Sequence, residues 1–111
     1  SDLGQLYKSG LLSDVTLIVG NRRFPVHKAI LAARCEFFQT MFAGPYAESV
    51  AGEVRFEHAL PDAVDFVLQF LYTNHVDTTT IGDADLVSSI LCLVDFWDVQ
   101  KLLDILQGAS G

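Results

Sequence analysis

The chain has 111 residues, enough for one domain with a single hydrophobic core. Its 14 acidic and 7 basic residues give a formal net charge of −7, which argues against nucleic-acid binding, because phosphate contacts require concentrated lysine and arginine. Half of the residues are hydrophobic, yet no apolar run reaches the roughly 18 residues that span a bilayer. We therefore expect no membrane contact, and the surplus of apolar residues favours an oligomer or a domain that docks onto a partner.

The chain begins with a predicted short helix at residues 2–9, which ends at Gly10. Helical spacing brings Leu3, Leu6 and Tyr7 onto one face of it. Such a face packs either against the rest of its own domain or against a partner.

A β-hairpin is predicted next. Residues 14–19 are mostly β-branched and apolar, as expected for a strand, and residues 23–26 form the return strand. Gly20 and Asn21 supply the turn. Pro25 favours an edge position for the return strand, because proline donates no hydrogen bond to a neighbouring strand.

The middle of the chain predicts three helices and a strand. Residues 28–34 and 36–43 read as two short helices, the second with an apolar face. Residues 53–57 alternate strictly, which indicates a half-buried strand. A longer helix begins near Pro61, where the missing N–H costs nothing, and runs to about Tyr72.

The C-terminal third predicts two more helices. Asn74, a residue that tolerates left-handed backbone geometry, follows the preceding helix. After a polar connector, an apolar helix runs from about residue 83 to residue 96. Asp98 is the predicted N-cap of the last helix. Residues 108–111 are predicted to form a flexible tail.

Residues capable of covalent or metal chemistry are sparse. Cys35 and Cys92 lie far apart among apolar neighbours, which predicts buried free thiols and a reducing intracellular compartment, the cytoplasm or the nucleus. His27, at a helix start, is expected to be structural. No histidine has a cysteine or carboxylate at metal-ligand spacing, and no paired acid and base, activated nucleophile or phosphate-binding glycine loop is visible. We therefore expect no metal, no cofactor and no catalytic residue.

The segment 13–20, followed by 24–34, resembles the opening of a BTB/POZ domain, whose pattern is roughly Asp-Val-x-Leu-x-Val, a tight turn and Phe-x-x-His-Lys-x-x-Leu-Ala-Ala. The resemblance covers residues 3–107. It implies a single α+β domain over residues 1–111, with a short three-stranded sheet, a cluster of five to six helices and a further short strand before the last two helices. Three later landmarks also match the family: Phe37-Phe38-x-x-Met41-Phe42, Phe70-Leu71-Tyr72-Thr73 and Asp95-Phe96-Trp97-Asp98-Val99.

The resemblance also implies a partner. Cullin-binding members of the family carry an apolar-x-Glu motif in the loop after the second short helix, and Tyr46-x-Glu48 is similar to it. A large apolar side chain fills a pocket on a helical partner, and a carboxylate fixes the register by accepting hydrogen bonds. Trp97 and Phe42 are further candidates for this contact, with a core role as the alternative for each. The alternative for the loop itself is a solvated acidic segment with Tyr46 packed back on the domain.

A homodimer is the second implication. Leu3, Leu6 and Tyr7 resemble the apolar face that BTB domains pair across a two-fold axis. Asp14 and Lys28 match an acidic and a basic residue at the dimer interface of related repressors, and we expect them to form a buried ion pair.

Two functions follow from these residues. In the first, the domain dimerises and recruits a cullin-3-type ubiquitin ligase scaffold to substrates that another domain holds. In the second, it is the dimerisation domain of a transcription regulator or scaffold that recruits a corepressor. The Tyr46-x-Glu48 motif favours the first function. In neither would this domain bind nucleic acid itself.

Overall fold

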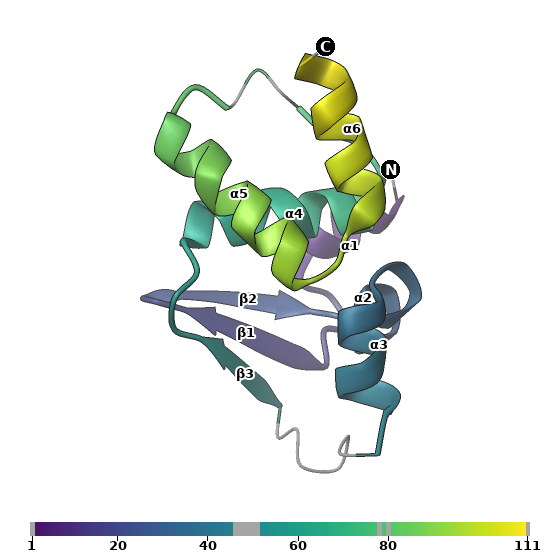
Figure 1. Ribbon diagram of the computed structural model, residues 1–111. Coiled ribbons are helices and arrows are strands. Elements are labelled where there is room, and N and C mark those ends of the chain that lie inside the picture. Colours follow the sequence, from purple (N-terminus) through teal and green to yellow (C-terminus); the bar gives the residue numbers. More distant parts are fainter. Residues whose placement is uncertain (1, 46–51, 78, 80, 111) are drawn as a thin grey trace.

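The computed structural model describes residues 2–45, 52–77, 79 and 81–110. They form the α+β fold predicted from the sequence, with a three-stranded sheet beside a cluster of helices (Figure 1). The elements are α1 (Asp2–Ser9), β1 (Val15–Val19), β2 (Arg22–Val26), α2 (Lys28–Arg34), α3 (Glu36–Ala43), β3 (Glu53–Phe56), α4 (Pro61–Thr73), α5 (Ala84–Phe96) and α6 (Gln100–Ser110).

The sheet has the order β2-β1-β3. β1 and β2 form the predicted antiparallel hairpin, and Gly20 at φ +59° provides the left-handed backbone conformation that a two-residue turn requires. β3 pairs with β1 in parallel, with Leu17 opposite Val54. Both β2 and β3 are therefore edge strands, which confirms the edge position expected from Pro25.

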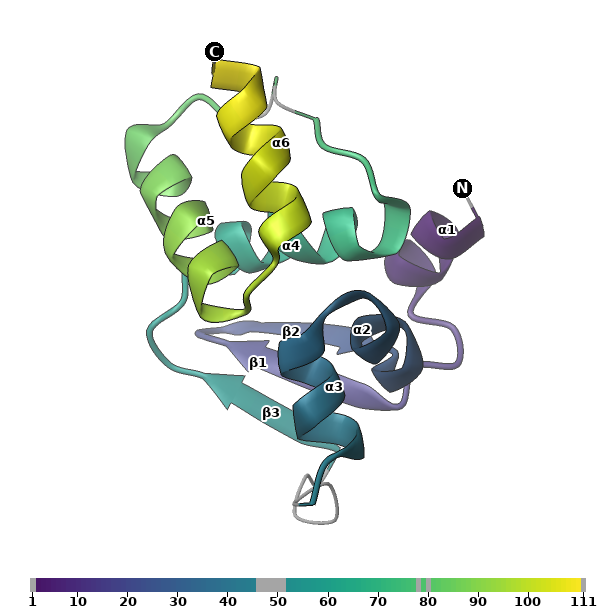
Figure 2. The same ribbon diagram turned by 45° about the vertical axis from the view of Figure 1, so that its right-hand side comes forward.

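Helices lie over one face of the sheet and at one end of it. In Figures 1 and 2, α4 and α5 lie together across from the sheet, and the pair α2–α3 packs near one end of the strands. α6 extends away from the sheet, and α1 lies against α4. The long helices α4 and α5 thus form the second layer of a two-layer domain.

The core fills the space between these layers. Alternate residues of β1 (Val15, Leu17 and Val19) and of β2 (Phe24 and Val26) are buried, and α4 contributes seven buried residues. Burying each large aliphatic side chain contributes about 1.5–3 kcal/mol. The largest side chains that are less than 2% exposed include Trp97, Tyr72, Phe38, Leu17, Leu31, Leu68 and Leu71.

The ends of the two long helices follow their sequence signals. Pro61 stands in the first turn of α4, and Asn74 caps its end in the left-handed region, at φ 60° and ψ 23°. Asp83 is the N-cap of α5, where its carboxylate accepts a hydrogen bond from the backbone N–H of Asp85 at 2.9 Å.

The predicted N-cap of the last helix was wrong. Asp98 has φ 56°, and its side chain caps nothing, while the carbonyl of Val99 accepts the first hydrogen bonds of α6 from Leu102 and Leu103. Trp97 and Val99 are both buried, so the turn places Asp98 between them on the surface. The burial of two flanking apolar residues outweighed the capping preference of one aspartate.

Three other expectations differ from the structure. α6 continues to Ser110, so the flexible tail predicted from residue 108 is helical there. Cys92 is exposed rather than buried, because α5 turns Ile90, Leu93 and Val94 toward the core and Cys92 away from it. The described residues between α4 and α5 contain no strand, although a short one was expected. None of the described helices has the length and apolar character needed to cross a membrane.

Candidate partner-binding surface

An aromatic cluster joins α3, β3 and the end of α5. Trp97 is at its centre, with ring centroids 4.8 Å from Phe38 and 5.5 Å from Phe56. Phe37 lies 5.2 Å from both Phe38 and Phe96. Edge-to-face and tilted pairs at these distances stabilise beyond the area that they bury. The cluster fixes the end of α5 against α3.

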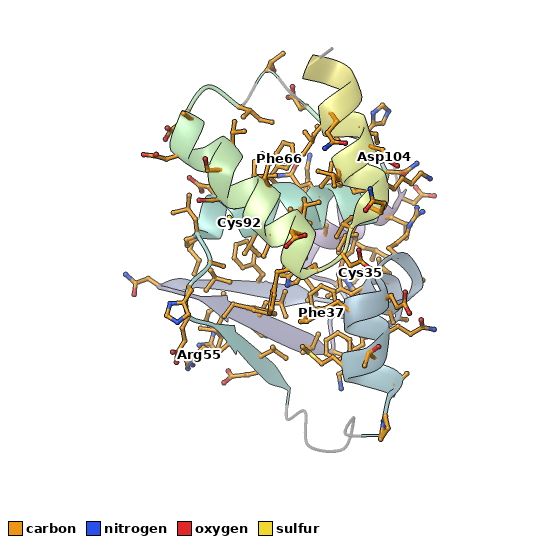
Figure 3. The ribbon with its side chains drawn as sticks, in the orientation of Figure 1. Cys35, Phe37, Arg55, Phe66, Cys92 and Asp104 are labelled. Carbon is orange, nitrogen blue, oxygen red and sulfur yellow. The ribbon has the colours of Figure 1, made fainter. Side chains whose placement is uncertain are left out.

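Trp97 is 0% exposed, so its indole is not on the surface of the domain. Burial favours the core alternative for this residue over direct contact with a cullin. A second link supports that role, because the Cys35 thiol donates a hydrogen bond to the Trp97 carbonyl at 3.2 Å. Burial raises the pKa of the Cys35 thiol, which keeps it in the donating form. Figure 3 shows Cys35 between the helices and Phe37 over the sheet.

Phe96, next to Trp97, is the aromatic residue that reaches the surface. Its side chain is 62% exposed, although it contacts Phe37. It borders a cavity of about 430 Å³. Two carboxylates, those of Glu36 and Asp98, lie at this cavity, so its rim is acidic. The lining residues are Glu36, Phe37, Thr40, Met41, Phe96 and Asp98.

Sequence reasoning missed Phe96 as a surface residue, because adjacent aromatics on a helix with apolar residues on several faces do not reveal which one points inward. Phe42, which it did select, is half-buried. The Phe42 ring stacks on Phe38 at 5.7 Å, and the Lys28 ammonium lies 5.8 Å from its centroid. Phe42 therefore packs against the core through Phe38, and part of its ring is also exposed to solvent.

Tyr46 and Glu48 lie outside the described residues. Their segment connects the end of α3 with β3, whose Phe56 and Val54 pack against the core. The role predicted for this pair therefore stays a prediction.

The face of α1 is divided between the domain and solvent. Leu6 and Tyr7 pack against the core, and Leu3 is 36% exposed. The Tyr7 hydroxyl donates a hydrogen bond to Asp65 on α4 at 2.5 Å, and burial, reinforced by this bond, raises the pKa of Tyr7 well above its usual range. Within one chain, Tyr7 thus packs against its own domain, which was the alternative to a dimer contact. Leu3 is exposed and could contact a second copy.

Two further exposed leucines follow α1. Leu11 and Leu12, in the connector between α1 and β1, are 62% and 82% exposed. The three residues Leu3, Leu11 and Leu12 are called the N-terminal leucine surface below. Exposed large apolar side chains of this kind favour contact with another protein.

Within the described part of the single chain, Asp14 and Lys28 form no ion pair, and the buried pair expected at a dimer interface stays a prediction. Asp14 is exposed, and its carboxylate accepts a hydrogen bond from the backbone N–H of Lys28 at 2.8 Å. The Lys28 ammonium lies over Phe42 instead. The N–H of Lys28, at the start of α2, has no acceptor within the helix, and Asp14 therefore supplies one. A negative charge at this end also interacts favourably with the helix dipole.

His27 is buried and structural, as the sequence predicted. Its Nε2 lies 2.6 Å from the Leu11 carbonyl, which only accepts, so Nε2 carries the proton. The Tyr72 hydroxyl accepts from the backbone N–H of His27 at 2.9 Å and donates to its Nδ1 at 2.6 Å. Burial raises the pKa of Tyr72 to about 12. All polar atoms of the two side chains have hydrogen-bond partners.

The arrangement of these residues suits recognition of a partner. An exposed aromatic over a cavity with an acidic rim is an anchor for a helix with apolar and basic side chains. Within the described residues, no group of three or more metal-ligating side chains is found.

The exposed apolar side chains of this small α+β domain favour contact with other proteins. The family model for the BTB/POZ domain matches residues 3–109, and the chain belongs to that family. The structure is similar to the BTB domain of zebrafish PATZ1, with a TM-score of 0.79 and 27% identity over 97% of this chain and 84% of that one.

Curated relatives include Kelch-like proteins. The chain is 35% identical over 100 residues to human Kelch-like protein 30, which is 90% of this chain and 17% of the relative. It is 44% identical over 75 residues to human Kelch-like protein 21, which is 67% of this chain and 13% of the relative. The chain thus spans less than one fifth of the length of these relatives.

Proposed function

We propose that this chain is the dimerising adaptor domain that recruits a cullin-3-type ubiquitin ligase scaffold to substrates held by another domain. The observation that carries the proposal is the exposed Phe96 beside Phe37, at a cavity with an acidic rim. Tyr46, the first residue of the Tyr46-x-Glu48 motif, is the third residue after the end of α3 at Ala43. Similarity to Kelch-like proteins 30 and 21 supports the same proposal.

In this proposal the domain carries out no chemical step and only holds the scaffold near the substrate. Phe96 and Tyr46 would enter apolar pockets of a scaffold helix, and Glu48 would accept hydrogen bonds that fix its register. Glu36 and Asp98 would attract basic residues around those pockets and speed association. The N-terminal leucine surface would pair with that of a second copy, so that one assembly carries two scaffolds.

Calorimetric titration with the N-terminal region of cullin 3 tests the adaptor role. We expect binding by the native chain, and at least about 30-fold weaker binding for Phe96→Ser and for Glu48→Lys, because an anchor at the centre of an interface contributes about 2 kcal/mol or more. Val87→Ser is the matched control, since Val87 is also exposed on α5, at 38%, but does not line the cavity. Absence of binding by a folded native chain would contradict the proposal.

A second candidate is the dimerisation domain of a transcription regulator or scaffold. The similarity to the BTB domain of zebrafish PATZ1 favours this second candidate, because PATZ1 is a BTB protein that is not named as a Kelch-like protein. A native chain that is dimeric by light scattering but does not bind the cullin would support this candidate.

A further inference from the structure

The outer edge of β3 offers free backbone groups. The N–H of Thr16 donates to the carbonyl of Gly52, so the backbone groups of residues 52, 54 and 56 face β1. Groups alternate along a strand, and those of Glu53 and Arg55 therefore point away from the sheet. Within the described residues, β3 pairs with β1 alone. An edge of this kind is a template for an added strand.

An apolar groove borders the same strand. It has a volume of about 610 Å³ and lies between α5 and the end of β3 with its connector to α4. Figure 3 shows Arg55 at the end of β3 and Cys92 on α5, on the same side of the molecule. Leu60 and Phe96 line the groove and are 42% and 62% exposed. Its other apolar lining residues are Phe56, Ala59, Ala63 and Leu93.

The outer face of the sheet, away from the long helices, carries an ion pair between Arg23 of β2 and Glu53 of β3. Arg22 faces the helices instead and pairs with Asp62 of α4 at 3.0 Å. Arg55 is exposed and has no ion-pair partner among the described residues. A carboxylate placed beside Arg55 would form an ion pair with its guanidinium group.

We propose that β3 and this groove bind an extended peptide that alternates apolar and acidic residues. Its backbone adds a strand at Glu53 and Arg55, which supplies affinity without regard to sequence. Its apolar side chains face the helices and enter the groove, because alternate residues of a strand share one face. Its acidic side chains lie on the other face, beside Arg55. This surface shares Phe96 with the proposed scaffold contact, but strand addition at β3 goes beyond that contact and does not depend on it.

The probe is the capped peptide acetyl-Thr-Val-Asp-Leu-Asp-Val-Thr-amide, titrated into the ¹⁵N-labelled chain and followed by NMR. We expect shifts at the amides of Arg55 and of the groove residues on α5. Two N-methylated derivatives test strand pairing. One carries methyl groups on the backbone nitrogens of both Asp residues and the other on those of Val, Leu and Val, and strand addition lets only one derivative keep its affinity. Equal binding by both derivatives, or no shift at these amides with any of the three peptides, would overturn the proposal.

Two pairs of variants locate the site. Ser88→Trp fills the groove and is expected to abolish binding, whereas Val87→Trp, on an exposed neighbouring position outside it, is not. Arg55→Glu is expected to weaken binding about 2–5-fold and to favour a peptide with Lys in place of Asp, while Arg34→Glu on α2 leaves both peptides unchanged. Loss of binding in both tryptophan variants, or no charge preference, would contradict the assignment. Concentration-dependent shifts at the same amides without peptide would assign the edge to a second copy instead.

Discussion

Two regions of this domain are stabilised in different ways. Around Trp97, aromatic rings from α3, β3 and α5 pack together, and the indole Nε1 has no hydrogen-bond partner among the described residues. Around His27 and Tyr72, the buried polar atoms are paired with one another and with backbone groups. The first region depends on shape and volume, and the second depends on the protonation states of its members. Substitutions that change side-chain volume should therefore affect mainly the first region, and changes of pH mainly the second.

The largest effect is expected at the aromatic cluster. Trp97→Ala should lower the free energy of unfolding by about 3–5 kcal/mol, since it leaves a large cavity between α3 and α5. Urea denaturation followed by circular dichroism measures this loss. Tryptophan fluorescence is unsuitable, because Trp97 is the one tryptophan of the chain and the variant lacks it. Trp97→Phe should cost clearly less, because no hydrogen bond of the indole is lost with it. Equal losses for the two variants would mean that volume does not control this region.

The polar network should respond next. Tyr72→Phe removes the acceptor of the His27 N–H and the donor to Nδ1, and should cost about 1–3 kcal/mol, because buried polar atoms remain unpaired. Phe70→Leu, in the same helix, is a control for packing without polar change. A Tyr72→Phe variant as stable as the native chain in the same denaturation experiment would contradict a structural role for the network.

Alkaline pH should weaken the polar network through Tyr72. Tyr72 has its pKa raised by burial from 10.0 to about 12, so its neutral form is favoured in the folded chain. The stabilisation is fully present below pH 10 and is lost as the pH rises toward 12, with about 1.4 kcal/mol lost at pH 11. Thermal unfolding between pH 8 and pH 11.5 measures it. Tyr72→Phe should show a shallower decline, and a decline of equal slope would assign the effect to other groups.

The smallest effect is expected at the turn between α5 and α6. Asp98 has φ 56°, which glycine adopts at no steric cost. Asp98→Gly should therefore leave the free energy of unfolding unchanged or raise it by up to about 1 kcal/mol, and Asp98→Val should lower it. Chemical denaturation of the two variants is the measurement. A destabilised Asp98→Gly chain would point to a role of the carboxylate that the turn geometry does not require.

Local sequence signals determined the hairpin, the helices and the edge position of β2. Gly20 with Asn21, Pro61 and Asn74 act within a few residues of the chain, and each adopts the geometry that its chemistry favours. The landmarks of the BTB/POZ family were readable for the same reason, because they are short and contiguous. The single domain over residues 1–111 and the contact predicted for Tyr46 and Glu48 remain predictions.

Only the tertiary structure decided which side chains face outward where a helix is apolar on several sides. On α5 it exposed Cys92 and Phe96, and just after the helix it buried Trp97, because α4 packs along one side of α5 and the rings of α3 enclose Trp97 at its end. It likewise placed Asp98 in a turn rather than at a cap, and paired Asp14 with a backbone N–H rather than with an ammonium group. These outcomes depend on segments far apart in the sequence, whose packing free energy exceeds the local preference of any one residue.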